Sequence, residues 1–341
     1  MKHLLDMSMA DLQAHLAELG EKSYRAAQVL QWVWSKAAPD FAAMTNLPAA
    51  LREALAEQMT VLSGRVVDRR DARDGVSKLL IEWPDGQRVE TVLIPADKRV
   101  TACLSTQAGC AIGCAFCASG AGGLGRNLTA GQIVEQVLQL QLAGGQKVTH
   151  AVFMGTGEPL ANYEATLTAV RTLIDPERGG LSGRHMTIST IGLPAAMRRL
   201  AQEGIPLTLA ISLHAPDDAL RRRLIPAARG VTIAEIIAAA QDYFARTGRE
   251  VTVEYLLLRG VNDAPEHATR LAALVRPLRG NVNLIRYNPV PGLPFQRPEE
   301  QGVRDFRDRL EALGINVQIR ASRGSEIQAA CGQLRRQHPR R

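Results

Sequence analysis

The sequence predicts an α/β protein, a partial TIM-like (β/α)6 barrel that follows an N-terminal helical domain and a small antiparallel β extension. From about residue 98 onward, β-like runs alternate with helix-like runs, which is typical of parallel βαβ units. Six such repeats and one late β-like run fall short of the eight repeats of a closed barrel. Before residue 98, apolar residues recur first at helical spacing and then with a period of two.

Residues 1–58 form the predicted helical domain. Apolar positions recur at helical spacing over 9–20, 25–37 and 48–58, with Gly and Pro between these runs. Trp32 and Trp34 could stack on a nucleic-acid base, but on a short amphipathic helix we expect them to belong to the core.

Residues 59–97 form the predicted β extension. Its apolar residues alternate, and Asp74-Gly75 and Pro84-Asp85-Gly86 are typical hairpin turns. A small antiparallel sheet should therefore connect the helical domain to the barrel.

Residues 98–334 form the predicted barrel core. Thr129 and Gln132 predict a capping box at the start of its first helix. The predicted strands are 100–106, 149–155, 185–190, 207–213, 251–258 and 281–287, with 315–321 as the late seventh. The predicted helices are 129–145, 164–174, 194–204, 233–247 and 266–278.

Three of the five cysteines, Cys110, Cys114 and Cys117, have the spacing C-x3-C-x2-C. Three clustered thiolates can hold three irons of a [4Fe–4S] cube and leave the fourth iron open for a ligand. Radical S-adenosylmethionine (SAM) enzymes need such an iron, because the amino and carboxylate groups of SAM chelate it. Zinc is the alternative, but structural zinc sites usually pair two C-x2-C knuckles, and the next cysteine here is Cys331. The motif therefore favours an iron–sulfur cluster.

Composition adds weaker constraints. The hydrophobic fraction of 46% is ordinary for a soluble protein, and no apolar run is long enough to span a membrane. Free thiol ligands suit a reducing, cytoplasmic location. The net charge of +7 suggests a polyanionic partner, although four arginines in the predicted basic tail, residues 335–341, account for more than half of it. This tail and the run at 221–223 could equally be solvated surface.

Small and polar residues follow several predicted strands. In β/α barrels, ligands bind at the carboxyl ends of the strands, so these side chains should converge beside the cysteine loop. An acceptor for an ammonium, a glycine that allows close backbone approach, and hydroxyl or amide groups are what SAM requires. Singly, each would more often be a turn, a cap or a structural histidine. The residues are Gly157, Glu158, Ser189, Ser212, His214 and Asn288.

The two remaining cysteines are far apart in the sequence. Cys103 lies in the first barrel strand, and Cys331 lies between small residues near the end of the chain. Both could be inert core residues, the usual role of cytosolic cysteines. The neighbours of Cys331 instead indicate an accessible thiol, and two thiols at the barrel mouth could act in covalent chemistry.

Six stretches together resemble the adenine-C2 RNA methyltransferase family of the radical SAM superfamily, in order from about residue 18 to residue 334. They are RVETVLIP, GCAIGCAFCASG, MGTGEPLANY, ISLHAP, IRYNPVPG and EIQAACGQL. Two positions depart from the family pattern: Thr156, where Met is common, and Glu326, where Asp is usual.

The resemblance implies a role for each site residue. Cys110, Cys114 and Cys117 would ligate the cluster, and Cys331 would carry the methyl group as S-methylcysteine. Cys103 would resolve the covalent intermediate through a transient disulfide with Cys331. Glu90 would accept a proton, although the strand pattern alone makes it an exposed partner of Arg88. The implied SAM contacts are Gly157, Glu158, Ser189, Ser212, Leu213, His214 and Asn288.

The resemblance also implies the reaction. Carbon 2 of adenine is electron-poor and has no nucleophilic lone pair, so an electrophilic methyl group cannot be transferred to it directly. Two SAM molecules per turnover would methylate Cys331 and then generate a 5′-deoxyadenosyl radical that activates that methyl group. The substrates would be 23S rRNA near the peptidyl-transferase centre and tRNA beside the anticodon, bound with help from residues 1–58. A flavodoxin-type protein would donate electrons, and we expect a monomer.

Two other functions remain open from the sequence. A related family methylates carbon 8 of adenine in 23S rRNA and confers antibiotic resistance, and it shares the catalytic motifs quoted above. A non-catalytic iron–sulfur or zinc RNA-binding module is the third hypothesis, but such a module has no use for Cys103 and Cys331.

Overall fold

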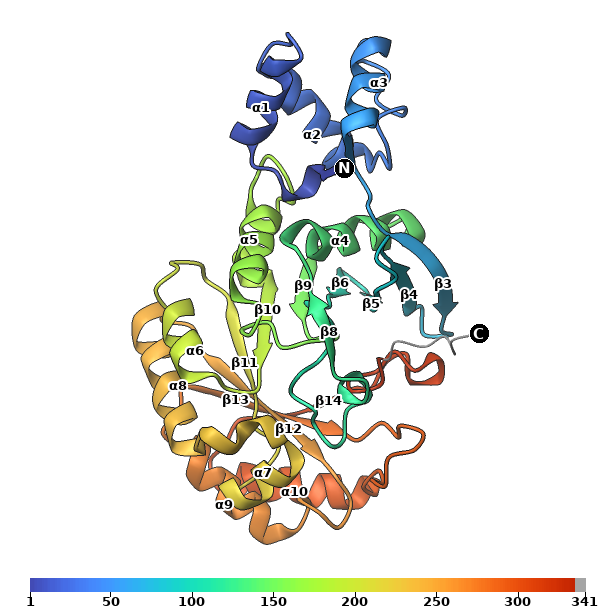
Figure 1. Ribbon diagram of the computed structural model, residues 1–341. Coiled ribbons are helices and arrows are strands. Elements are labelled where there is room, and N and C mark those ends of the chain that lie inside the picture. Colours follow the sequence, from blue (N-terminus) through green and yellow to red (C-terminus); the bar gives the residue numbers. More distant parts are fainter. Residues whose placement is uncertain (335–341) are drawn as a thin grey trace.

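The computed structural model describes residues 1–334, so the predicted basic tail, residues 335–341, lies outside the described residues. Seven parallel strands form the barrel, each paired with its neighbour. They are β6 (Arg99–Cys103), β9 (His150–Phe153), β10 (Met186–Thr190), β11 (Thr208–Ser212), β12 (Val251–Leu257), β13 (Gly280–Arg286) and β14 (Val317–Arg320). The predicted partial barrel and its late seventh strand are confirmed (Figure 1).

The antiparallel extension is part of the same sheet rather than a separate one. It consists of β3 (Arg65–Asp71), β4 (Ser77–Glu82) and β5 (Arg88–Ala96). Because β5 pairs antiparallel with β6, one sheet of ten strands runs in the order β14-β13-β12-β11-β10-β9-β6-β5-β4-β3. This continuity places residues of the extension directly beside the barrel interior.

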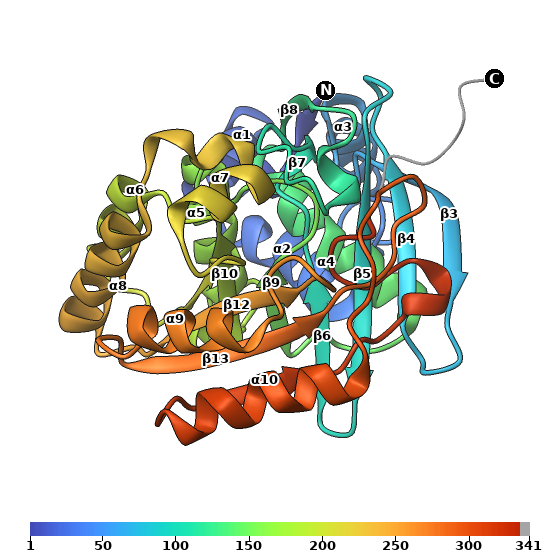
Figure 2. The same cartoon turned by 90° about the horizontal axis from the view of Figure 1, so that it is seen from below.

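Helices cover the outer face of the barrel strands (Figure 2). They are α4 (Ala130–Gly144), α5 (Tyr163–Ile174), α6 (Pro194–Leu200), α7 (Asp218–Leu224), α8 (Ile233–Thr247), α9 (Pro265–Val275) and α10 (Glu300–Ala312). The predicted capping box of Thr129 and Gln132 starts α4, and Gly145 ends it in the left-handed conformation. Within residues 1–334, no helix combines the length and apolar character that crossing a membrane requires.

Three helices form the N-terminal part: α1 (Met9–Glu18), α2 (Tyr24–Lys36) and α3 (Ala49–Gln58). They lie at one end of the molecule, beyond α4 and α5 (Figure 1). Trp32 and Trp34 are half-buried against the hydrophobic core. His3 connects this part to the barrel, because its ring lies 3.3 Å from the Glu135 carboxylate on α4. Burial opposes the charge, but hydrogen bonds with Asp6 and Glu135 raise the pKa of His3 to about 9.

Successive side chains along each barrel strand point alternately to the hydrophobic core between the sheet and the helices and to the space enclosed by the barrel. On β10, the buried Met186 and Ile188 belong to the core between sheet and helices. The half-buried Thr187 and Ser189 alternate with them and line cavities inside the barrel. The barrel interior is therefore the place where polar groups from many strands meet.

Candidate active site

The three clustered cysteines lie in a loop closed by a short hairpin, β7 (Gln107–Gly109) and β8 (Leu124–Asn127). The Cys110 N–H donates to the Gly123 carbonyl at 3.1 Å, and the Cys117 N–H donates to the Cys114 carbonyl at 3.1 Å. Close backbone packing requires glycine in this loop: a Cβ on Gly120 would lie 2.9 Å from the Gly113 Cα. The small residues of the motif thus allow the loop to fold tightly around its thiols.

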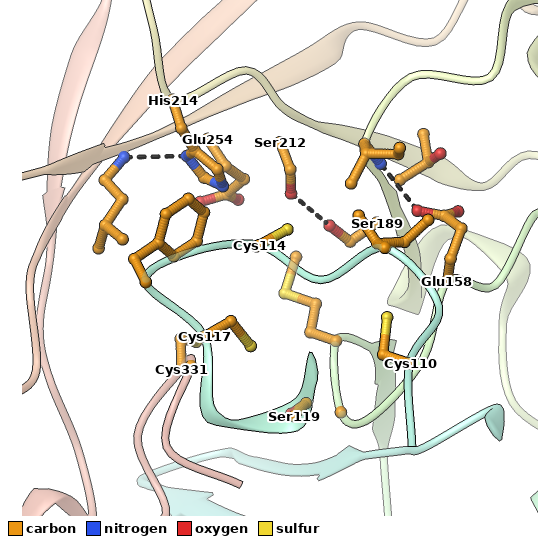
Figure 3. Close-up of a pocket in the computed structure, with 18 of the residues that line it drawn as sticks. Cys110, Cys114, Cys117, Ser119, Glu158, Ser189, Ser212, His214, Glu254 and Cys331 are labelled. Carbon is orange, nitrogen blue, oxygen red and sulfur yellow. Dashed lines mark hydrogen bonds between the residues drawn. The ribbon is translucent and has the colours of Figure 1, made fainter. Parts of the chain in front are cut away.

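All three thiols are free and half-buried, and they face a common space (Figure 3). Burial raises the pKa of each thiol, that of Cys110 to about 11. A cluster must therefore displace thiol protons when it binds. In residues 1–334, no three His, Cys, Asp or Glu side chains converge on a single ion. A cube differs from such a site because each cysteine ligates a separate iron.

A cavity of about 150 Å³ adjoins the cysteine loop. Five of the seven predicted SAM residues line it together with the three cysteines, and these five are Gly157, Glu158, Ser189, Ser212 and His214. The structure thus brings together residues from the ends of three different strands, as the barrel geometry predicts.

Leu213 and Asn288 do not line this cavity. The Leu213 side chain packs in a hydrophobic cluster with Ile233 and Val253, so only its backbone could face a ligand. Asn288 lines a second cavity, and its Nδ2 lies 3.5 Å from the Cys331 carbonyl. Its buried Oδ1 has no hydrogen-bond partner among the described residues, which leaves an acceptor for a ligand.

Glu158 is a buried carboxylate at this cavity, 3% exposed. Its two oxygens accept hydrogen bonds from the backbone N–H groups of Ile191 at 2.8 Å and Leu160 at 3.0 Å. Burial nevertheless raises its pKa to about 7. A ligand ammonium would favour the ionised form, so the site suits a cationic amine.

Gly157 lets the chain pass close to the neighbouring strand end. Its φ is +112°, and a Cβ there would lie 2.7 Å from the Gln107 Cβ and 2.8 Å from the Gln107 nitrogen. The adjacent Thr156, which departs from the family pattern, is buried, and its N–H donates to the Ser105 Oγ at 2.8 Å. Thr156 makes this hydrogen bond through its backbone N–H, so the bond does not depend on the Thr156 side chain.

His214 is buried and neutral, because burial lowers its pKa to about 3. Its Nδ1 accepts the Leu256 N–H at 3.0 Å, which places the ring proton on Nε2. Ser189 and Ser212, on adjacent strands, have hydroxyl oxygens 3.3 Å apart. The cavity therefore offers an N–H donor and two hydroxyl groups to a polar ligand.

Cys331 is held beside the cysteine loop by the C-terminal segment, residues 324–334 (Figure 3). The Ala118 N–H donates to the Gly332 carbonyl at 2.8 Å, and the Ser119 hydroxyl donates to the Leu334 carbonyl at 2.9 Å. Farther along, Glu326 accepts the Arg73 N–H at 2.5 Å, so this departure from the family pattern attaches the segment to the β extension. The Cys331 thiol is half-buried and lines both cavities.

Cys103 is buried and lines the second cavity together with Cys331. Burial, and then the nearby Cys331, raise its pKa to about 12. Both thiols are free, so the expected disulfide between them is not present in this structure.

Glu90 is not the exposed partner of Arg88 that its strand pattern suggests. Its carboxylate forms a buried ion pair with Lys78, with 2.8 Å between Oε1 and Nζ. Glu90 is two positions from Val92, which pairs with Cys103, so Glu90 and Cys103 face the same side of the sheet. Glu90 is not among the residues that line either cavity.

Sequence reasoning missed three charged residues of the site. Glu254 and Arg320 line both cavities, and 3.9 Å separates their charged groups. In the sequence, a charged residue that alternates with apolar ones along a strand has the pattern of an ordinary solvent-facing position. No sequence signal therefore distinguished Glu254 and Arg320 as residues of the barrel interior. Arg221, predicted as part of a solvated or RNA-binding run, is 1% exposed and donates to the Ile191 carbonyl beside Glu158.

Comparison with known proteins agrees with this geometry. The profile described as "Ribosomal RNA large subunit methyltransferase N-terminal domain" matches residues 2–61, and that of the radical SAM superfamily matches residues 104–272. A protein of Symbiobacterium thermophilum named "Probable dual-specificity RNA methyltransferase RlmN" is 49% identical, with 96% of this chain and 90% of its own covered. A relative of the same name in Thermosynechococcus vestitus is 46% identical over 97% of this chain and 98% of its own.

A crystal structure of a radical SAM methyltransferase from Sphaerobacter thermophilus superposes with a TM-score of 0.95. It is 45% identical, and the match covers 98% of this chain and 99% of that one. Radical SAM enzymes use a [4Fe–4S] cluster and SAM, and the three thiols, the buried Glu158 carboxylate and the unpartnered Asn288 oxygen fit those groups. The chain therefore belongs to the RlmN family of dual-specificity RNA methyltransferases, within the radical SAM superfamily.

Proposed function

We propose that this protein methylates carbon 2 of adenine in 23S rRNA, near the peptidyl-transferase centre, and in tRNA beside the anticodon. The position of Cys331 supports this proposal most directly. Its thiol lines the cavity beside the cysteine loop and also the cavity that contains Cys103. A methyl-carrying cysteine needs both neighbours, because it must receive the methyl group on one side and be resolved by a second thiol.

In the proposed reaction, the cluster is held by Cys110, Cys114 and Cys117. The Glu158 carboxylate accepts a hydrogen bond from the ammonium group of SAM. Gly157, Ser189, Ser212, His214, the Leu213 backbone and Asn288 complete the SAM contacts. When bound, the cluster and SAM supply a methyl group to the Cys331 sulfur and a radical that abstracts hydrogen from that methyl group.

Three side chains act after the methylene carbon joins the adenine ring. Glu90 accepts the proton released from carbon 2, which requires the Lys78–Glu90 pair to rearrange toward the cavity. The adduct also gives up its unpaired electron, which the cluster would take up. The Cys103 thiolate then attacks the Cys331 sulfur to form a disulfide, and the electron pair of the broken carbon–sulfur bond stays on the carbon attached to adenine, which takes a proton and becomes the methyl group. The Arg320 guanidinium favours this step, because it lines the second cavity together with both thiols and its positive charge stabilises a thiolate. Cys331 first, and then Glu254 and Cys103, raise the pKa of Arg320.

The Cys103→Ala variant tests this scheme. Without the resolving thiol, protein should accumulate cross-linked to RNA through Cys331, and mass spectrometry of the adduct would identify that residue. The Cys331→Ala variant is the matched control and should form no adduct. Normal turnover by Cys103→Ala would refute the resolving role.

The alternative product is adenine methylated at carbon 8. The curated relatives are named for dual specificity, which favours carbon 2. Mass spectrometry and NMR of the methylated nucleoside locate the methyl group, and a product methylated only at carbon 8 would overturn this choice. We further propose cytoplasmic action as a monomer, a flavodoxin-type electron donor, and RNA binding by residues 1–58 and by the basic tail.

A further inference from the structure

Arg221 on α7 is buried, unlike its two neighbours in the arginine run 221–223. It is 1% exposed, whereas Arg222 and Arg223 are exposed. A buried charge is costly unless an opposite charge lies close to it. In the described part of the chain, no carboxylate lies at ion-pair distance from Arg221, and its Nε has no hydrogen-bond partner. The protein therefore keeps a buried cation without a paired carboxylate.

The Arg221 side chain extends toward the cavity beside the cysteine loop. Its Nη2 donates to the carbonyl of Ile191, which lines that cavity together with the three clustered cysteines. The Ile191 N–H in turn donates to the Glu158 carboxylate at 2.8 Å. Arg221 itself does not line the cavity, so its guanidinium lies in the wall behind Ile191.

The same helix supports the cysteine loop, beside which it lies (Figure 2). The N–H of Ala115, between Cys114 and Cys117, donates to the Leu224 carbonyl of α7 at 2.9 Å. Leu224 also packs in one hydrophobic cluster with Phe116 of the loop. Apolar packing of this kind excludes water, so a charge here acts more strongly than it would at the surface.

The charge of Arg221 acts on residues of the site. Burial lowers the pKa of Arg221, while Asp218 and Cys114 raise it. Burial, and after it Arg221, lower the pKa of His214. The Asp218 carboxylate accepts the Ile233 N–H at 2.8 Å and is not paired with Arg221. Because an arginine stays protonated in proteins, this positive charge is permanent.

The missing negative charge is that of the cluster. A [4Fe–4S] cube held by three thiolates has a net negative charge, and one-electron reduction makes it more negative. Nearby charge and burial are among the features by which a protein sets the reduction potential of such a cluster. A fixed cation in the wall of the site therefore favours the reduced form.

We infer that Arg221 supplies the buried counter-charge of the cluster and raises its reduction potential, so that the electron donor can reduce it more readily. One electron passes from a flavodoxin-type protein, or from another one-electron reductant, to the cluster. The hydrogen bond to Ile191 holds the guanidinium in place, and Arg221 contacts neither SAM nor RNA. The inference rests on the proposed function, because it requires the cysteine loop to bind the cluster.

A redox titration of anaerobically reconstituted protein, followed by EPR of the reduced cluster, measures this effect without turnover. Arg221→Gln removes the charge but keeps an N–H donor for the Ile191 carbonyl. It should make reduction at least 10-fold less favourable, which is about 59 mV for a one-electron couple. Arg221→Lys keeps the charge and should restore most of the wild-type potential. Arg222→Gln, at the exposed neighbour, is the matched control and should leave the potential unchanged, since solvent screens its charge.

An unaltered potential in Arg221→Gln, or an equal shift in Arg222→Gln, would overturn the inference. Iron and sulfide content shows whether each variant has folded and loaded its cluster. If Arg221→Gln binds no cluster, Arg221→Lys decides the question, and a loss of about 10-fold in that variant would overturn the inference as well. A wild-type protein that binds no iron–sulfur cluster would instead refute the proposed function.

Discussion

Glu158→Gln should change how the stability of the protein depends on pH. Burial raises the pKa of Glu158 from 4.5 to about 7, so in the folded, ligand-free protein this carboxyl stays protonated where the unfolded chain has lost the proton. The folded state then binds one more proton between pH 4.5 and 7, and its free energy of unfolding falls as the pH rises through that window. A glutamine at this position cannot titrate, so the variant lacks this loss.

The size of the effect follows from the two pKa values. Their difference corresponds to about 3 kcal/mol, lost progressively between pH 4.5 and 7. The amide also presents an NH2 group to one of the two backbone N–H donors, Leu160 or Ile191, but this penalty does not depend on pH. The free energy of unfolding of wild type relative to Glu158→Gln should therefore decrease by about 3 kcal/mol across the window.

Urea unfolding of both proteins in parallel, under reducing conditions at several pH values, measures this difference. The comparison must be made at each pH, because His214 has the opposite effect. Its pKa is lowered from 6.5 to about 3, so the wild-type protein gains stability as the pH rises toward 6.5. The two effects oppose each other in either protein alone, but His214 cancels in the difference. Parallel curves for the two proteins would refute the assignment of Glu158 as a buried carboxyl with a raised pKa.

Two other substitutions test the packing around the site. Gly157→Ala should cost about 2–5 kcal/mol, because its positive φ is strained for alanine and the new Cβ would overlap Gln107. Gly204→Ala, at φ +68° with no atom within 4 Å, should cost only about 1 kcal/mol, so equal losses in urea unfolding would contradict this reasoning. Lys78→Met should cost about 3–5 kcal/mol, since it removes the buried cation that pairs with the Glu90 carboxylate. Arg65→Gln, which breaks an exposed ion pair with Glu82, should cost less than about 1 kcal/mol of unfolding free energy. A similarly small loss for Lys78→Met would show that the Lys78–Glu90 ion pair contributes little to stability.

The sequence predicted the barrel well because each strand and helix has a local pattern. Alternating and helical periodicities identify β6, β9 to β14 and the helices α4, α5, α6, α8 and α9 without reference to distant residues. The helices α7 and α10 were not predicted. The hairpin of β7 and β8 has no such pattern, since its strands are three and four residues long, and it was not predicted. The pairing of β5 with β6 was also missed, because the sequence does not show whether two neighbouring sheets join.

The chemistry of the site was predictable where a motif carries it and unpredictable where distant contacts create it. The cysteine spacing indicated a cluster loop, and the strand ends indicated five of the residues that line the first cavity. The burial of Arg221 depends on a carbonyl 30 residues away, and the position of Glu90 depends on Lys78 on the neighbouring strand. The segment that carries Cys331 is held by hydrogen bonds that Ala118 and Ser119 donate to Gly332 and Leu334, more than 200 residues later in the chain, and no local pattern reveals them.

The central claim is that three thiolates hold a cube with one iron left open for SAM. The most direct measurement is the formation of 5′-deoxyadenosine by anaerobically reconstituted protein supplied with SAM and a reductant. We predict that wild type forms it and that Cys110→Ala, Cys114→Ala and Cys117→Ala variants do not. A wild-type protein with a fully loaded cluster that releases no 5′-deoxyadenosine would contradict the claim.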